Sequence, residues 1–122
     1  DVTHATDHPD VDKRVNGDIK IGGGPVPSIG PNVNTPLVDL IIKTAKSKRI
    51  PYQLEAAPRG TGTDANVMQL SRAGVATALV SVPNRYMHTP VEIVSLADLE
   101  ATAKLVAETV LAIHRKTNFI PE

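Results

Sequence analysis

The sequence contains no cysteine, and aromatic residues make up only 2% of it. Without cysteine the chain can form neither disulfides nor thiolate metal sites, so a metal ion would have to be bound by oxygen or imidazole nitrogen. The absence of cysteine also fits a reducing cytoplasm. Because Tyr52, Tyr86 and Phe119 are the only aromatic side chains, a carbohydrate hydrolase with aromatic platforms along a sugar-binding cleft is disfavoured.

The sequence also lacks a net charge and a long apolar run. The 13 basic and 13 acidic residues cancel, so we expect neither nucleic acid nor an anionic membrane as a partner. No stretch approaches the roughly 20 apolar residues that cross a bilayer. A hydrophobic fraction of 41% in 122 residues fits one globular domain spanning 1–122.

The chain begins at Asp1 without a methionine, and its first residues resemble the end of a strand. From this start we expect a fragment of a longer protein.

Hydrophobic spacing predicts an α/β fold, with a mostly parallel sheet flanked by helices. Strands are expected at four places: the opening residues, 19–21, 52–56 and 75–82. Three helices are expected to begin at Thr35, Asp64 and Ser95. Loops are predicted over 7–17 and over 22–36, where four glycines and four prolines favour turn geometry.

The predicted helices have recognisable starts. Thr35 is expected to cap the first helix while Pro36 occupies its first turn, and Ser95 with Asp98 resembles a capping box. The last helix is the clearest, because it has apolar residues repeated every three or four positions. These residues are Leu96, Leu99, Ala103, Val106, Val110 and Ile113.

Functional residues are expected in loops after strands, since ligands bind beyond the carboxyl ends of parallel strands. Three loops qualify: 1–7, 59–64 and 84–88. An imidazole at His88 suits a metal ion or a substrate, although a hydrogen-bonded surface histidine is the simpler interpretation. Asp1 and Asp7, near His4 and His8, suit a cation or only a turn that caps backbone N–H groups.

The glycine-rich stretch 60–64 matches neither a phosphate-cradling loop nor a dinucleotide fingerprint, so nucleotide binding is not expected. Its glycines would let the backbone approach a ligand closely, and Asp64 either caps the following helix or takes part in binding. No serine lies in a nucleophile-elbow context.

Four motifs, in order, resemble the end of the tetrahedral aminopeptidases, cytosolic metallopeptidases that have also been labelled endoglucanases. The motifs are Asp-Val-Thr-His-Ala-Thr-Asp-His-Pro at 1–9, the glycine-rich stretch 22–31, Arg-Gly-Thr-Gly-Thr-Asp-Ala at 59–65 and Arg-Tyr-Met-His-Thr-Pro at 85–90. The resemblance covers nearly the whole chain and implies the C-terminal portion of a zinc-aminopeptidase-like catalytic domain.

The resemblance implies two zinc or cobalt ions, with Asp1 binding one and His88 the other, and a glutamate as general base. Two adjacent cations would polarise the scissile carbonyl and activate a bridging water. The motifs also place Asp7 and Asp64 near the site, in a supporting or substrate-binding role.

The remaining ligands, the general-base glutamate and an inserted assembly domain of the family have no counterpart in this sequence. We therefore expect the chain to be inactive alone and to need the missing N-terminal portion, with peptides as substrates and a homo-oligomer, a dodecamer in the family, as the assembly. The alternative is a non-catalytic α/β binding or structural half-domain.

Overall fold

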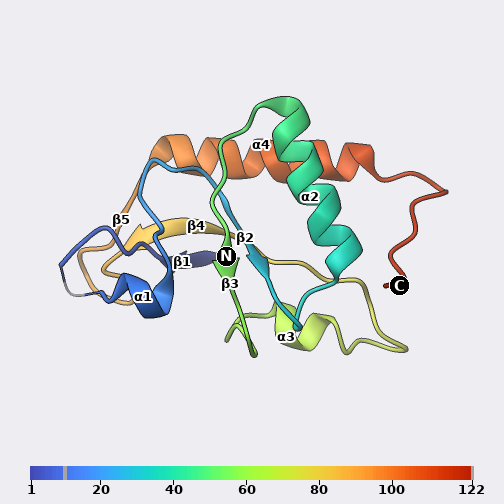
Figure 1. The fold of residues 1–122 in the computed structure, drawn as a ribbon, viewed down its shortest axis with the longest axis horizontal. Helices are drawn as coiled ribbons and strands as arrows, with labels where there is room; N and C mark the ends of the chain where they lie inside the picture. The colour runs from blue at the N-terminus through green and yellow to red at the C-terminus, as the bar shows by residue number, and fades with distance from the viewer. Residues whose placement is uncertain (10, 122) are drawn as a thin grey trace.

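The computed structural model describes residues 1–9 and 11–121, which form five short strands and four helices (Figure 1). In chain order they are β1 (Val2–His4), α1 (Lys13–Asn16), β2 (Val26–Ile29), α2 (Thr35–Lys48), β3 (Glu55–Ala56), α3 (Ala65–Met68), β4 (Val80–Arg85), β5 (Ile93–Val94) and α4 (Leu96–Ala112). The α/β class, with helices packed on a sheet, is confirmed.

The sheet is mixed rather than mostly parallel. Its strands lie in the order β1-β4-β2-β3, and β5 pairs with β4 off this path. β1 runs parallel to β4, with Val2 beside Val82, and β2 runs parallel to β3. However, β2 is antiparallel to β4, with Val26 beside Ser81. The loops that follow β3 and β4 therefore lie at opposite edges of the sheet.

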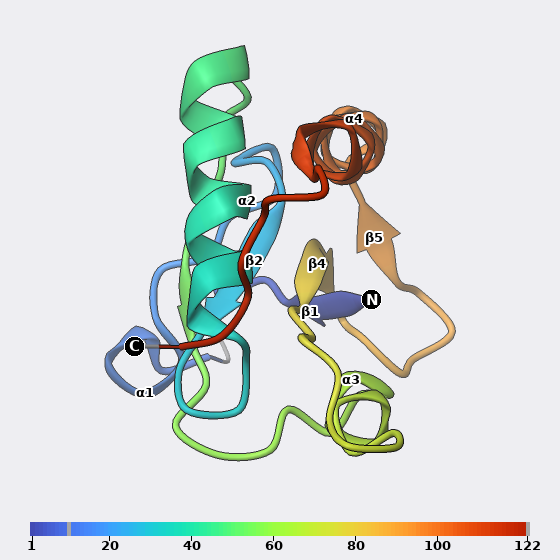
Figure 2. The ribbon, with the colours of Figure 1, turned by 90° about the vertical axis from the view of Figure 1, so that its right-hand side faces the viewer.

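The core lies where α2 and α4 meet the sheet. Ile41 and Ala45 of α2 pack with Leu105 of α4 and with Ile50. The partly buried Val80 of β4 packs against this cluster. Figure 2 looks along the axis of α4, and α2 runs vertically beside it in this view. Burial of such side chains stabilises the fold by about 1.5–3 kcal/mol each.

The predicted strand at 19–21 is wrong. Ile19 is fully buried but pairs with no strand, because its N–H and its carbonyl both bond to the Thr6 hydroxyl. The predicted loop 22–36 instead contains β2, an inner strand despite its proline. Pro27 is tolerated because the pairing of β2 with β4 is short, and the next N–H, that of Ser28, bonds to Leu79.

Three other boundaries differ from the prediction. The apolar strand expected at 75–82 begins only at Val80 and continues through Asn84 and Arg85, so tertiary pairing rather than hydropathy sets its position. The strand expected at 52–56 is two residues long, and the helix expected to run from Asp64 towards Gly74 is a single turn. The loop expected at 7–17 contains the one-turn helix α1.

The helix starts are close to those expected. α2 begins at Thr35, but its cap is Asn34, whose side-chain oxygen accepts from the N–H of Leu37, so the predicted Thr35 cap is wrong by one residue. Ser95 caps α4 as predicted, by accepting from the N–H of Asp98. The carboxylate of Asp98 takes no part in a reciprocal capping box.

The apolar repeat of α4 does not face the core. Leu96, Val106 and Val110 are 80%, 47% and 61% exposed, whereas the buried residues of the helix are Asp98, Leu105 and Thr109. The repeat therefore indicated the helix, which is confirmed, but not the face that the helix buries.

Candidate functional site

The mixed sheet divides the four predicted site residues between its two edges. Asp1 lies at the amino end of β1, where its N-terminal amine and its carbonyl bond to Val80 and Val82. Asp64 follows β3, which points towards this same edge. Asp7 and His88 follow the carboxyl ends of β1 and β4, so they lie at the other edge.

At the first edge, Asp1 and Asp64 line one cavity of about 410 Å³, together with Thr63 and Met68. The carboxylate of Asp1 accepts from the N–H of Val2. Asp64 is exposed and makes no side-chain capping hydrogen bond to α3, so the interpretation of Asp64 as a helix cap is wrong. The structure therefore brings these two carboxylates to a common cavity and leaves both oxygens of Asp64 open to a ligand.

At the other edge, Asp7 forms a two-pronged ion pair with Arg85, with both contacts at 2.7 Å. It also accepts from the N–H of Ile21. These hydrogen bonds, led by those from Arg85, lower the pKa of Asp7 to about 2. Asp7 thus ties the end of β1 to the end of β4, three residues before His88.

His88 sits in a turn of left-handed residues. Its φ is 64° and that of Tyr86 is 58°, a region that few residues other than glycine adopt. The N–H of His88 donates to the carboxylate of Glu92, which also accepts from the side chain of Asn84. These bonds lower the pKa of Glu92 and hold the turn, while the His88 residue itself stays exposed.

A cleft of about 620 Å³ runs along the sheet face between the two edges. It is lined by backbone and side chains of β1 and β3, by the loop 57–63 at one end, and by Met87 at the other. Across it, the hydroxyl of Thr3 donates to the carboxylate of Glu55 at 2.7 Å, which links the two outer strands of the sheet. The dimensions suit an extended peptide or another ligand of similar size.

Two serine hydroxyls lie on the inner strands of the sheet. Ser28 of β2 and Ser81 of β4 are 0% and 1% exposed, and neither hydroxyl finds a partner among the described residues. Buried polar groups are normally hydrogen-bonded, so such a pair is unusual. Ser81 lines the cleft, which gives the floor of the cleft a polar character.

The described residues fit the implied metal ions only in part. Carboxylate and imidazole are suitable donors for zinc or cobalt. However, no group of three His, Cys, Asp or Glu within residues 1–9 and 11–121 is placed to hold an ion. Asp1 lies beside Ser81 near the start of β4, whereas His88 follows the end of β4. We assign no chemical step to a metal in this chain.

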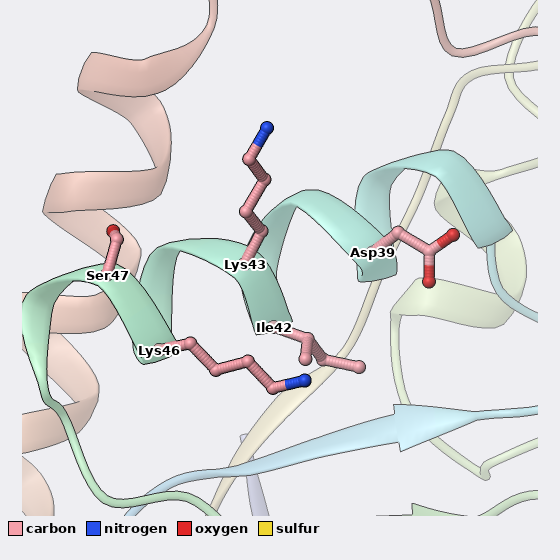
Figure 3. A pocket seen from close by; sticks show the side chains of 5 residues that line it. All are labelled: Asp39, Ile42, Lys43, Lys46 and Ser47. Carbon is pink, nitrogen blue, oxygen red and sulfur yellow. The ribbon is translucent and has the colours of Figure 1, made fainter.

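A second hollow, of about 580 Å³, lies on the outer side of α2. It is lined by Asp39, Ile42, Lys43, Lys46 and Ser47, and Figure 3 shows that the two lysines extend to different sides of the helix. Since all five side chains come from one helix and do not converge, this hollow is a surface groove rather than a candidate site.

No role in the site was predicted from the sequence for Arg85, Glu92, Glu55 or Asp98. Arg85 and Glu92 flank the His88 motif, and only the pairing of β4 with β1 and β5 shows what they contact. Asp98 is 1% exposed and accepts from the N–H groups of Gly22 and Gly24. From the sequence, Asp98 was interpreted only as part of a capping box with Ser95.

Comparisons with known proteins show which family the chain belongs to. Residues 1–105 match the profile of the M42 glutamyl aminopeptidase family. A lysyl aminopeptidase from Pyrococcus furiosus is 46% identical over 121 residues, which is 99% of this chain and 34% of that protein. The chain therefore spans about a third of the length of this relative.

Solved structures show the same fold. A TET aminopeptidase from a marine sediment archaeon, Thaumarchaeota archaeon SCGC AB-539-E09, superposes with a TM-score of 0.84 at 31% identity and covers 95% of this chain and 33% of its own. A structure of PhTET1, described as a dodecamer, gives a TM-score of 0.68 at 27% identity, over 90% of this chain and 32% of its own. From the profile match over most of its length, this chain belongs to the M42 glutamyl aminopeptidase family.

Proposed function

We propose that the chain forms one part of a metal-dependent aminopeptidase that releases N-terminal amino acids from peptides. The observation that carries the proposal is the 46% identity to a lysyl aminopeptidase over 99% of the chain. The cleft supports it, because a volume of about 620 Å³ accommodates several residues of an extended peptide.

Among the described residues no helix combines the length and hydropathy needed to cross a membrane. A cytoplasmic location remains a prediction.

The proposal gives the predicted residues separate tasks. Asp1 and His88 each supply one ligand to a two-metal site, zinc or cobalt, which residues outside this chain complete. Asp64 shares the cavity of Asp1 and is placed to position that carboxylate or a substrate. Asp7 positions the His88 turn through Arg85. Assembly into a homo-oligomer, as described for PhTET1, is part of the same proposal.

The test is an aminoacyl-anilide assay, including lysyl and glutamyl substrates, with metal analysis on the same samples. The chain is assayed alone and after co-expression with the part of the Pyrococcus relative that lies outside the matched third. We expect activity and bound metal only in the mixture. His88→Ala should reduce the rate at least ~100-fold, within the range seen when catalytic groups are removed. It should also lower the bound metal, because one of the two ions loses a ligand.

The matched control is His114→Ala, because His114 is an exposed imidazole beyond the end of α4. It should keep full metal content and rate. If His88→Ala also keeps both, His88 is not a ligand. If the mixture forms but cleaves no substrate, the chain is better described as a non-catalytic α/β half-domain.

A further inference from the structure

The loop 57–63 between β3 and α3 has few backbone hydrogen bonds. Over residues 58–62, all of which the structure describes, one backbone group is hydrogen-bonded, the N–H of Thr61. Gly60 and Gly62 add conformational freedom, and the φ of Gly62 is +72°. A segment with so few hydrogen bonds opens easily unless side chains hold it. The partner of Thr61 therefore decides how well this loop is ordered.

That partner is the side-chain oxygen of Asn66 in α3, which accepts from three donors. They are the N–H of Thr61 at 3.2 Å, the hydroxyl of Thr61 at 3.3 Å and the side-chain NH₂ of Asn32. The hydroxyl of Thr63 lies 2.8 Å from that of Thr61 and extends this chain of hydrogen bonds. Asn32, in the loop before α2, accepts in turn from the side-chain NH₂ of Gln69 at 2.8 Å. We call Asn32, Asn66 and Gln69 the amide cluster.

The orientation of each amide in the cluster is fixed from its two ends. The N–H of Thr61 can only donate, so Asn66 must present its oxygen there. The backbone carbonyl of Asn66 can only accept, so Gln69, at 3.4 Å, must present its nitrogen to it. Asn32 joins the two, with its oxygen towards Gln69 and its nitrogen towards Asn66. A network whose donors and acceptors alternate without conflict favours one geometry.

The loop 57–63 lies between the two hollows of the candidate site. Thr61 and Thr63 line the cleft along the sheet, and Thr63 also lines the cavity of Asp1 and Asp64. A ligand that reaches from the cleft into this cavity therefore passes Thr63. Asn66 lines neither hollow, but it is joined to Thr63 through the hydroxyl of Thr61. The amide cluster thus acts on the site from behind the loop.

We propose that Asn66 is a positioning residue for peptide binding. Through the amide cluster it holds the loop 57–63 in the shape that an extended peptide meets between the cleft and the cavity. A loop that is ordered in advance loses less entropy when the peptide binds, so the cluster raises affinity rather than the rate of the chemical step. The inference rests on the proposed function, because it takes a peptide as the ligand.

The test variants are Asn66→Ala, which removes the acceptor, and Asn66→Asp, which keeps an oxygen for the same three donors. The matched control is Asn118→Ala, because Asn118 is exposed and its side chain accepts from the N–H of Ile120. Amide hydrogen exchange of Thr61 is measured in the chain alone. KM and kcat are measured with lysyl-trialanine and with lysyl anilide, in the complex with the part of the Pyrococcus relative that lies outside the matched third.

In Asn66→Ala the Thr61 amide should exchange at least ~10-fold faster, because its hydrogen bond is lost. The KM for lysyl-trialanine should rise at least ~10-fold with kcat within ~2-fold of the parent value, since lost binding raises KM alone. The KM for lysyl anilide, which has no further residues to lie along the cleft, should change less than ~3-fold. Asn66→Asp and Asn118→Ala should keep each value within ~2-fold of the parent. Should circular dichroism show Asn66→Ala unfolded, Asn32→Ala replaces it, with the same changes at about a third of the size, since one donor of the cluster is lost.

The inference is overturned if the Thr61 amide exchanges unchanged in the alanine variant, if KM rises equally for the two substrates, or if Asn66→Asp fails to restore them. A complex that cleaves neither substrate counts against the proposed function alone. Calorimetric titration of lysyl-trialanine into the parent and Asn66→Ala complexes then decides the inference. A Kd at least ~10-fold higher in the variant supports it, whereas equal affinity, or no binding to either complex, overturns it.

Discussion

Asp7 makes the most sheltered ion pair of the described residues, and it joins the ends of two neighbouring strands. The side chains of Asp7 and Arg85 are 14% and 33% exposed, whereas Asp18 and its partners Lys13 and Lys20 are all at least 50% exposed. Exposed pairs contribute little, because water and salt screen them and two long side chains lose freedom. The pair of Asp7 with Arg85 should therefore contribute most of the pH-dependent stability at this edge.

Replacing Asp7 with Asn should lower the free energy of unfolding at pH 7 by about 1–2 kcal/mol, after allowance for the partial exposure of Arg85. The native pKa of Asp7, about 2, lies below the ordinary value of 3.8, so its contribution is complete above pH 3.8 and is lost as the pH falls towards 2. Urea unfolding of both proteins between pH 7 and pH 2 measures the difference. Asp18→Asn is the control and should change stability little. A constant difference across this range would contradict the ion-pair explanation.

Among the elements, α2 gives the sharpest test of a helix start. Asn34 accepts from the N–H of Leu37, and its side-chain NH₂ also donates to the carbonyl of Phe119. Asn34→Ala should therefore destabilise the protein by about 1–2 kcal/mol, while Thr35→Ala should cost less than about 0.5 kcal/mol. Thermal unfolding of the two variants measures this. A larger loss of stability in Thr35→Ala than in Asn34→Ala would place the cap at Thr35 instead.

The glycine turn before β2 gives a second test. Gly22 and Gly24 have φ of +83° and +87°, and both N–H groups donate to Asp98 of α4. An added Cβ at Gly22 meets no atom, whereas at Gly24 it would overlap the backbone carbonyl of Pro51.

Gly22→Ala should accordingly cost only the left-handed strain, about 1–2 kcal/mol. Gly24→Ala should cost at least about 3 kcal/mol, because overpacking against rigid backbone is added to the strain. Chemical denaturation of the two single variants measures the gap between them. A gap below about 1 kcal/mol would mean that the Pro51 segment moves aside.

At the scale of the whole molecule, the exposed apolar residues of α4 should make the isolated chain bind a hydrophobic dye. These residues are Leu96, Leu99, Ala103, Val106, Val110 and Ile113. Exposed apolar patches of this kind mark interaction surfaces. Fluorescence of anilinonaphthalene sulfonate should rise with the parent chain, and the double substitution Val106→Glu and Val110→Glu should reduce the signal at least ~2-fold. Lys104→Glu should leave it unchanged. Strong dye binding by all three proteins would place the exposed apolar surface elsewhere.

The direction of β2 decides the layout of the candidate site. Because β2 and β3 run against β1 and β4, the loop at 57–63 meets the amino end of β1 instead of the His88 turn. The cleft then extends from the loop at 57–63 to Met87, which suits an extended ligand. This layout depends on strand pairing, which links residues up to about 80 positions apart.

The local sequence by itself determined several features. Asn34, Pro36 and Ser95 fix where α2 and α4 begin, because caps act within one helical turn. The order of the motifs pointed to the M42 family, and the match over residues 1–105 confirms it. The absence of cysteine limits metal ligands to oxygen and nitrogen donors.

Only the tertiary structure decided the rest, because strand pairing and burial depend on residues distant in the chain. Pro27 lies in an inner strand, and β4 begins at Val80, because neighbouring strands supply the pairing. Periodicity found the apolar stripe of α4 but could not tell which of two apolar faces meets the sheet. Asp98 shows the same limit: only the folded chain places its carboxylate against the N–H groups of Gly22 and Gly24.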